Sequence, residues 1–168
     1  DLGRHSAAIR DDLYRAVQRV LDSGWYVLGR EVQAFEHDMA GYCGVQHCVG
    51  VGSGTDALEL GLRALGVAVG DVVATVANAG MYSSAAIVAV GAMPSYVDVD
   101  ESLTMSPPAL EEVLGSGVKA VIVTHLYGRM GSMRELVRIC RAAGVPIIED
   151  CAQAIGAELD GTAAGAWG

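Results

Sequence analysis

A short apolar run that follows Pro146 and ends in two carboxylates, Glu149 and Asp150, constrains this fold more than any other stretch. A run without polar alternation is typical of a parallel strand that is buried on both faces. Open α/β sheets bind ligands at the carboxyl ends of such strands. We therefore expect Asp150 to reach into a crevice at that edge, with Gln153 one turn later. The simpler alternative is that Asp150 only caps a turn.

Similar apolar runs recur along the chain and alternate with segments of helical periodicity. Repeated strand–helix units with non-alternating strands predict an α/β fold, in which helices cover a mostly parallel sheet. The turn signal Asp160-Gly161 near the end of the chain is typical of a hairpin. We expect strands near 47–51, 71–76, 94–99, 119–125 and 146–150, and helices near 8–23, 31–42, 58–65, 82–90, 107–114 and 132–143.

Charge and hydropathy exclude some classes of partner. The chain has 168 residues and a formal net charge of −9, which argues against binding to nucleic acid or to an anionic membrane surface. No apolar run reaches transmembrane length and no signal-peptide pattern is present, so we expect a cytoplasmic protein. The mean hydropathy of +0.36 is high for a monomer, and it indicates that something outside this chain covers apolar surface.

The four cysteines show no CxxC spacing. Cys43 and Cys48 lie close in sequence to His37 and His47, which is a weak indication of a metal site. Reduced, half-buried thiols are the expected state in a cytoplasmic protein. We therefore assign no metal.

A glycine-rich turn at residues 52–56, Gly-Ser-Gly-Thr-Asp, leads from the first expected strand into a helix. A helix N-terminus presents free N–H groups and the positive end of the helix dipole, so this turn is either an anion site or a plain helix cap. The glycines Gly50, Gly52 and Gly54 are spaced as GxGxG and not as GxGxxG, and no GxxxxGK[ST] element is present. The turn therefore does not indicate a dinucleotide site.

Several motifs occur in a fixed order along the chain. They are Ser23-Gly24-Trp25, Phe35-Glu36, Ser53-Gly54-Thr55-Asp56-Ala57-Leu58, Gly91-Ala92-Met93-Pro94 leading to Val97-Asp98-Val99-Asp100, His125-Leu126-Tyr127-Gly128 and Glu149-Asp150-Cys151-Ala152-Gln153-Ala154. Together they resemble the DegT/DnrJ/EryC1/StrS family of pyridoxal-phosphate-dependent sugar aminotransferases. The resemblance covers nearly the whole chain.

The resemblance implies a fold-type-I, aspartate-aminotransferase-like large domain and a homodimer. It also implies that an amino group passes from an amino-acid donor, glutamate or glutamine, to a nucleotide-linked keto-sugar in amino-sugar biosynthesis. By position, Gly54, Thr55 and Asp56 would hold the phosphate of pyridoxal 5′-phosphate. Asp150 would pair with the pyridine nitrogen and Gln153 would contact the ring hydroxyl side. A protonated ring nitrogen is what makes this cofactor an electron sink.

The chain also departs from the family pattern. Gly80 stands where the family has an aromatic ring over the cofactor face. Met81 is our candidate to replace that ring, and Tyr82 is the alternative if the register shifts. We expect residues 1–168 to form a partial cofactor-binding domain, with the Schiff-base lysine and the small C-terminal domain outside it. The only lysine, Lys119, begins a strand at the end opposite the crevice, so we expect weak cofactor binding and no transamination by these residues alone.

Two alternatives remain open. One is a pyridoxal-phosphate-dependent sugar dehydratase of the same family, which uses histidine in place of the lysine. The other is a short, non-catalytic relative that acts as a partner subunit. Residues 25–28, Trp-Tyr-Val-Leu, are expected to lie in a subunit interface or beneath a segment outside this chain. The alternative is that they form a buried loop packed on the first helix. The residues that select the sugar, the aminated carbon and the amino donor are not identifiable.

Overall fold

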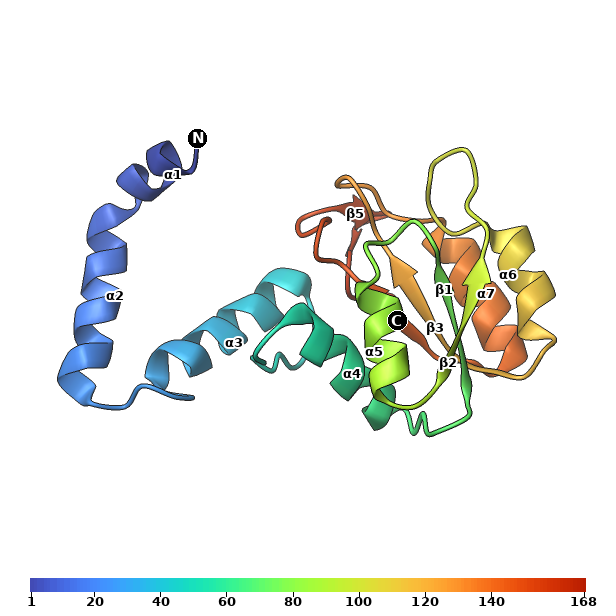
Figure 1. Cartoon of the computed structure of the whole chain (residues 1–168). Helices are drawn as coiled ribbons and strands as arrows, with labels where there is room; N and C mark the ends of the chain where they lie inside the picture. The colour runs from blue at the N-terminus through green and yellow to red at the C-terminus, as the bar shows by residue number, and fades with distance from the viewer. The chain divides into compact units, whose positions relative to one another are not determined.

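The computed structural model describes all 168 residues as two compact units, residues 1–50 and 51–168 (Figure 1). The first unit contains the helices α1 (Leu2–Ala8), α2 (Arg10–Ser23) and α3 (Arg30–Cys43). The second contains a sheet, its covering helices and a hairpin. Its elements are α4 (Gly54–Ala64), β1 (Val72–Val76), α5 (Tyr82–Ala89), β2 (Met93–Val97), α6 (Pro107–Leu114), β3 (Val118–Thr124), α7 (Met133–Ala143), β4 (Ile147–Asp150), β5 (Glu158–Leu159) and β6 (Thr162–Ala163).

The predicted fold class is confirmed. Strands β1 to β4 form one parallel sheet in the order β2-β1-β3-β4. Helices α4 and α5 pack with one face of this sheet through one apolar cluster, and α6 and α7 pack with the other face through a second cluster. The carboxyl ends of the strands therefore meet at a single edge of a sheet that is covered on both faces.

Strand β3 shows why its apolar run folds as a central strand. Along β3 only Lys119 is exposed. Val121 and Val123 belong to the cluster with α6 and α7, whereas Ala120 and Ile122 belong to the cluster with α4 and α5. Because successive side chains point to opposite faces, a strand with helices on both sides needs apolar residues at nearly every position.

The predicted strand at 47–51 is wrong, since these residues form no strand. A strand is held by hydrogen bonds to a neighbouring strand, and no strand of the chain pairs with this segment. The Gly50 N–H donates instead to the Glu36 carboxylate at 2.7 Å. Glycines at 50 and 52 also weaken strand formation.

The predicted helix at 8–23 is also interrupted in the structure. Ile9, at φ −114° and ψ 15°, departs from helical geometry and separates α1 from α2. A β-branched side chain is slightly unfavourable in a helix, and no buried contact holds α1 and α2 in line. The hairpin predicted at Asp160-Gly161 is confirmed. Both residues have positive φ, 55° and 75°, as a type I′ turn requires.

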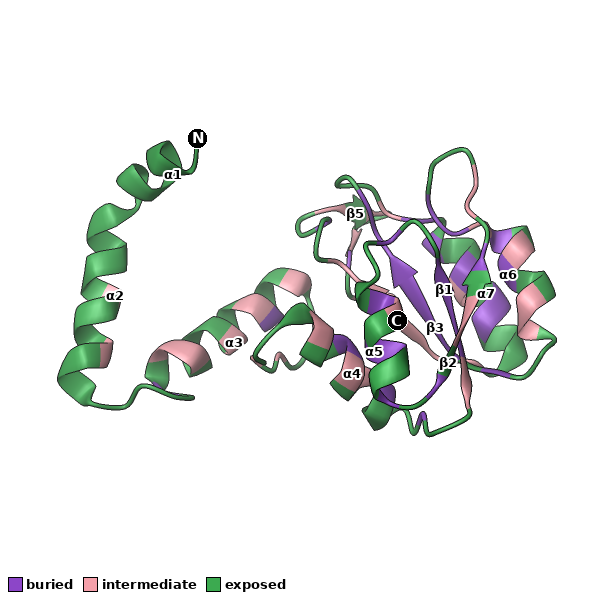
Figure 2. Cartoon of the chain, viewed as in Figure 1, coloured by how far each residue is buried: buried purple, intermediate pink, exposed green.

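Burial differs between the two units (Figure 2). In the second unit the central strands β1 and β3 and the inner sides of the helices are buried, whereas β4 is half-buried and β2 is partly exposed. In the first unit α1 and α2 contain no buried residue, and Ala40 is the only buried residue of α3. No helix of the structure is both long enough and apolar enough to span a membrane.

Candidate functional site

A small hollow of about 90 Å³ lies at the carboxyl edge of the sheet. Its lining comes from the loop after β1, from the end of β3 and from the end of β4. Asp150 and Gln153, two of the predicted site residues, lie in this lining. Ligand pockets commonly measure roughly 300–1,000 Å³, so the hollow has room for one edge of a cofactor ring.

Backbone hydrogen bonds fix the two polar side chains that follow β4. One oxygen of the Asp150 carboxylate, Oδ1, accepts from the Ala152 N–H at 3.2 Å. The side-chain oxygen of Gln153 accepts from the Tyr127 N–H at 3.2 Å, and its backbone carbonyl accepts from the Gly128 N–H at 3.0 Å. Because the Gln153 oxygen is engaged, its NH₂ group remains as the donor. The site therefore offers one carboxylate oxygen, Oδ2 of Asp150, and one amide donor.

Two buried hydroxyls in the lining have no hydrogen-bond partner. They are Ser83 Oγ in the first turn of α5 and Thr124 Oγ1 at the end of β3. A buried polar atom without a partner costs about 1–3 kcal/mol, so native structures rarely leave one unpaired. The hollow is therefore suited to a ligand that carries hydrogen-bonding atoms at its inner edge. The sequence analysis missed both hydroxyls, because nothing in their local pattern separates them from ordinary core residues.

The aromatic side chain in the lining is Tyr82. Its ring lies against the backbone of Gly80: a Cβ atom added at Gly80 would stand 3.0 Å from Tyr82 Cε2. Met81 is not part of the lining, and its side chain is 76% exposed. Met81 also has a φ of 64°, which places it in the left-handed region just before α5. Of the two ring-covering candidates, the structure brings Tyr82 and not Met81 to the hollow.

The predicted phosphate-binding residues lie at the start of α4, outside the lining of the hollow. Ser53 caps this helix by accepting from the Asp56 N–H at 3.1 Å. The N–H groups of Gly54 and Thr55 remain without an intrahelical partner, as at any helix start. Helix α4 leads into the loop that enters β1 at the amino edge, so its first turn lies toward the carboxyl edge (Figure 1).

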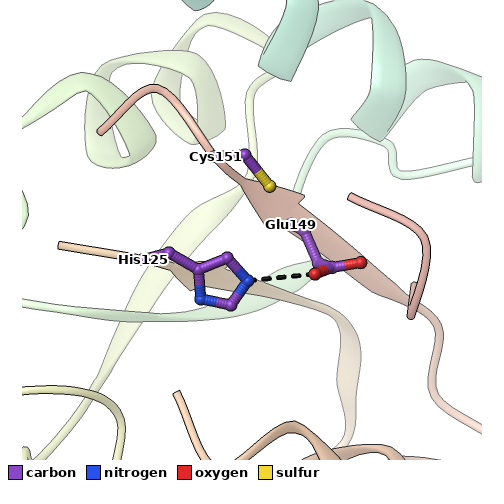
Figure 3. A group of neighbouring side chains, drawn as sticks. All are labelled: His125, Glu149 and Cys151. Atoms are coloured by element: carbon purple, nitrogen blue, oxygen red, sulfur yellow. Dashed lines mark hydrogen bonds and ion pairs between the residues drawn. The ribbon is translucent and has the colours of Figure 1, made fainter. Parts of the chain in front are cut away.

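His125, which belongs to the lining of the hollow, forms a buried pair with Glu149 (Figure 3). The Glu149 carboxylate accepts four hydrogen bonds: Oε2 from His125 Nε2 at 2.9 Å and from the Gly165 N–H at 3.1 Å, and Oε1 from the Trp167 and Gly168 N–H groups at 2.7 and 2.9 Å. Burial by itself would raise the pKa of the Glu149 carboxyl, but these hydrogen bonds hold that pKa below its ordinary value.

The second ring nitrogen of His125 settles the tautomer. His125 Nδ1 accepts from the Gly131 N–H at 3.2 Å, so this nitrogen carries no proton. The proton of the neutral ring is then on Nε2, which donates to Glu149. The pair is therefore a charge-assisted hydrogen bond between a neutral imidazole and a carboxylate, and not an ion pair. His125 is therefore a packed, hydrogen-bonded histidine.

His125, Glu149 and Cys151 also have the spacing of metal ligands, since their ligand atoms all lie within 4.8 Å of one another (Figure 3). A metal ion needs a lone pair from each ligand. The His125 Nδ1 lone pair already accepts from Gly131, Nε2 carries a proton, and each Glu149 oxygen already accepts two hydrogen bonds. We therefore assign this cluster to hydrogen bonding. The residues that gave only a weak indication of a metal site, His37, His47, Cys43 and Cys48, form no such group.

Comparison with known proteins matches this chain to one family. The model of the DegT/DnrJ/EryC1/StrS aminotransferase family matches residues 7–168. The chain is 40% identical to the dTDP-3-amino-3,6-dideoxy-alpha-D-galactopyranose transaminase of Aneurinibacillus thermoaerophilus, over 100% of this chain and 47% of the relative. It is 39% identical to a UDP-N-acetyl-3-dehydro-alpha-D-glucosamine 3-aminotransferase of Acidithiobacillus ferrooxidans, over 100% of this chain and 46% of the relative.

A solved structure agrees with these sequence matches. The crystal structure of S. venezuelae DesV in complex with a ketimine intermediate superposes with a TM-score of 0.94 at 39% identity, covering 97% of this chain and 44% of that one. The chain thus spans about half the length of the relatives that it matches. The match over residues 7–168 shows that the chain belongs to the DegT/DnrJ/EryC1/StrS aminotransferase family.

Proposed function

We propose that these residues are the cofactor-binding part of an aminotransferase that passes an amino group, from glutamate or glutamine, to a nucleotide-linked keto-sugar. One observation carries the proposal: Asp150 and Gln153 lie in a hollow at the carboxyl edge, and two buried hydroxyls in its lining lack partners. The names of the relatives support the substrate class. The family uses pyridoxal phosphate, which supplies an electron sink when it is bound.

The side chains of the hollow fit one edge of a pyridine ring. The Asp150 carboxylate would face the ring nitrogen and favour its protonated form, because opposite charges stabilise each other at close range. The NH₂ group of Gln153 would donate to the ring hydroxyl oxygen, since the Gln153 oxygen is already engaged. Tyr82 would cover one ring face, and the unpaired Ser83 and Thr124 hydroxyls would hydrogen-bond at the inner edge.

The first turn of α4 would hold the phosphate. The N–H groups of Gly54 and Thr55 face no intrahelical acceptor, and the helix dipole favours an anion there. Asp56 contributes through its backbone, because its N–H donates to Ser53 and thereby closes the turn. Its carboxylate lies against Gly52: a Cβ atom at Gly52 would stand 2.8 Å from Asp56 Oδ2. A side chain at position 52 would therefore displace the Asp56 carboxylate from this position.

These residues do not supply an imine-forming lysine at the hollow. Lys119 is exposed near the start of β3, and Thr124, at the other end of this strand, lines the hollow. Five residue steps along the strand place the two about 16 Å apart. We propose that the 168 residues hold the cofactor only by non-covalent contacts and that the complete enzyme takes its lysine from other residues.

A second copy of the chain is the proposed partner of the first unit. Leu13, Val17 and Leu21 recur every four residues on α2, and all three are exposed. Residues 25–28, Trp-Tyr-Val-Leu, are exposed as well. A unit of 50 residues whose apolar side chains stay in water has little to stabilise it, so these side chains require a covering surface.

Binding of pyridoxamine 5′-phosphate tests the proposed site, because this amine form of the cofactor needs no lysine. We expect Asp150→Asn to weaken its binding about 10- to 100-fold in calorimetric titration, since a charge-assisted hydrogen bond is lost. Asp38→Asn on the exposed surface of α3 is the matched control and should leave the affinity unchanged. Equal affinities of the wild type and Asp150→Asn would show that the cofactor does not use this hollow.

A further inference from the structure

The carboxylate of Glu149 lies on the opposite side of β4 from Asp150. Successive side chains of a strand alternate between faces, and Ile148 packs with the cluster of α4 and α5. Glu149 therefore points toward the face of α6 and α7, while Asp150 shares the face of Ile148. The two neighbouring carboxylates have separate surroundings: Asp150 lines the hollow, and Glu149 is buried behind it with a side-chain exposure of 2%.

The four donors to Glu149 come from two segments that lie far apart in the sequence. His125 directly follows β3, and the three backbone N–H groups belong to residues 165–168. A buried carboxylate is stable only when hydrogen bonds replace its lost water. Glu149 thus joins the ends of β3 and β4 to the 165–168 segment, and a neutral side chain of the same shape could not accept from all four donors.

His125 extends this connection to the loop that orients Gln153. Its backbone N–H donates to the Asp150 carbonyl at 2.9 Å, and its Nδ1 accepts from Gly131, so both ends of the 126–131 loop are held. Within that loop, the N–H groups of Tyr127 and Gly128 donate to Gln153. The Glu149 carboxylate is therefore connected to the Gln153 amide through His125 and the short 126–131 loop.

We propose that Glu149 is a positioning residue for the cofactor edge: its carboxylate locks His125 in the Nε2–H tautomer, and His125 in turn holds the 126–131 loop that orients Gln153 beside Asp150. The expected effect on cofactor binding rests on the proposed function, because positioning matters only where a ligand binds. The tautomer and the held loop do not depend on any ligand.

The test compares four variants of the full chain. Glu149→Gln removes the charge, and His125→Leu removes both ring contacts. His125→Gln keeps one donor and one acceptor, and is the conservative rescue. Glu158→Gln is the matched control, because Glu158 is an exposed glutamate on β5. Circular dichroism first establishes that each variant is folded.

Two measurements follow on the folded variants. Nitrogen-15 NMR of the wild type should show His125 with a bare Nδ1 and a protonated Nε2, and Glu149→Gln should lose this pattern together with the slow hydrogen exchange of the Gly165 and Gly168 amides. Affinity for pyridoxamine 5′-phosphate should fall about tenfold in Glu149→Gln and His125→Leu, because a buried charge-assisted contact is lost. His125→Gln should recover most of that loss, and Glu158→Gln should bind like the wild type.

The outcomes separate this inference from the proposed function. A protonated Nδ1 in the wild type, or unchanged affinity in Glu149→Gln, overturns the positioning role. If the wild type does not bind pyridoxamine 5′-phosphate but His125 and the 165–168 amides respond to Glu149→Gln, the connection stands and the proposed function fails. A variant that proves unfolded is replaced by His125→Gln, for which near-wild-type affinity supports the inference and a tenfold loss contradicts it.

Discussion

Gly80 has no side chain that could cover a cofactor ring, and Tyr82 brings an aromatic ring to the hollow instead. A Cβ atom at position 80 would stand 3.0 Å from Tyr82 Cε2, so the Tyr82 ring would have to shift slightly to make room for it. With no Cβ at position 80, the Tyr82 ring lies directly against the Gly80 backbone at the hollow. The local sequence left Met81 and Tyr82 as alternatives, and only the backbone geometry of the turn before α5 separates them.

Replacement of Tyr82 tests the proposed ring contact. Tyr82→Ala should weaken pyridoxamine 5′-phosphate binding by a few-fold to about tenfold, because an aromatic contact contributes about 0.5–1.5 kcal/mol beyond the area that it buries. Tyr82→Phe retains the ring and should bind nearly as the wild type does. Calorimetric titration measures both variants. A Tyr82→Ala variant of wild-type affinity would mean that another side chain covers the ring.

Glu149 makes the stability of the chain depend on pH. Its folded-state pKa lies below the ordinary value, so the stabilisation that it provides is complete above the unfolded pKa and is lost as the pH falls through the folded pKa. The unfolding free energy of the wild type should therefore exceed that of Glu149→Gln at pH 7, and the difference should shrink in acid. Urea unfolding at a series of pH values measures this difference in unfolding free energy. A difference that stays constant with pH would contradict the stabilising role of the ionised Glu149.

At the scale of elements, three helices have a serine at the N-cap, and α4 and α7 differ in how that serine is used. Ser53 accepts from the Asp56 N–H at the start of α4, whereas Ser132 makes no side-chain capping bond at the start of α7. A capping side chain satisfies one of the free N–H groups of the first turn. Ser53 therefore shapes the turn that is proposed to meet the phosphate.

Serine-to-alanine substitutions at these two positions form a matched pair. Ser53→Ala should lower the unfolding free energy by about 1 kcal/mol, because the Asp56 N–H loses its acceptor. Ser132→Ala should change it by much less. Urea unfolding followed by circular dichroism compares the two, and equal losses would show that Ser53 does not act through its cap.

At the scale of the whole molecule, the two units differ in how they are stabilised. The second unit has a sheet with apolar clusters on both faces, whereas in the first unit the apolar face of α2 is exposed. The ion pair of Arg19 with Glu31 connects α2 to α3 but is itself exposed, so it contributes little. Helices of this kind need a partner surface for their apolar side chains.

Sedimentation tests whether a second copy is that partner. We expect the wild type to sediment with about twice the 17.4 kDa mass of one chain. Val17→Glu combined with Leu21→Glu should shift the chain toward the monomer, because charges on this face would be desolvated in an interface. Arg15→Gln on the opposite side of α2 is the control. A wild type that remains a monomer at high concentration would contradict the proposed homodimer.

The sequence by itself was sufficient for the fold class and for part of the proposed site. Apolar runs such as 119–125 need cover on both faces, which dictates a parallel sheet between helices. The position of Asp150 at the end of such a run placed it at the carboxyl edge, since every parallel strand ends there. Both inferences depend on local periodicity, which a sequence displays directly.

Other features were decided only by the tertiary structure. The segment 47–51 has strand-like composition but no neighbour to pair with, and Gly50 donates to Glu36 instead. The pairing of His125 with Glu149 joins residues that lie 24 positions apart, and the same carboxylate then receives N–H groups from residues 165–168. Such contacts depend on which segments the fold brings together, and no local pattern records that.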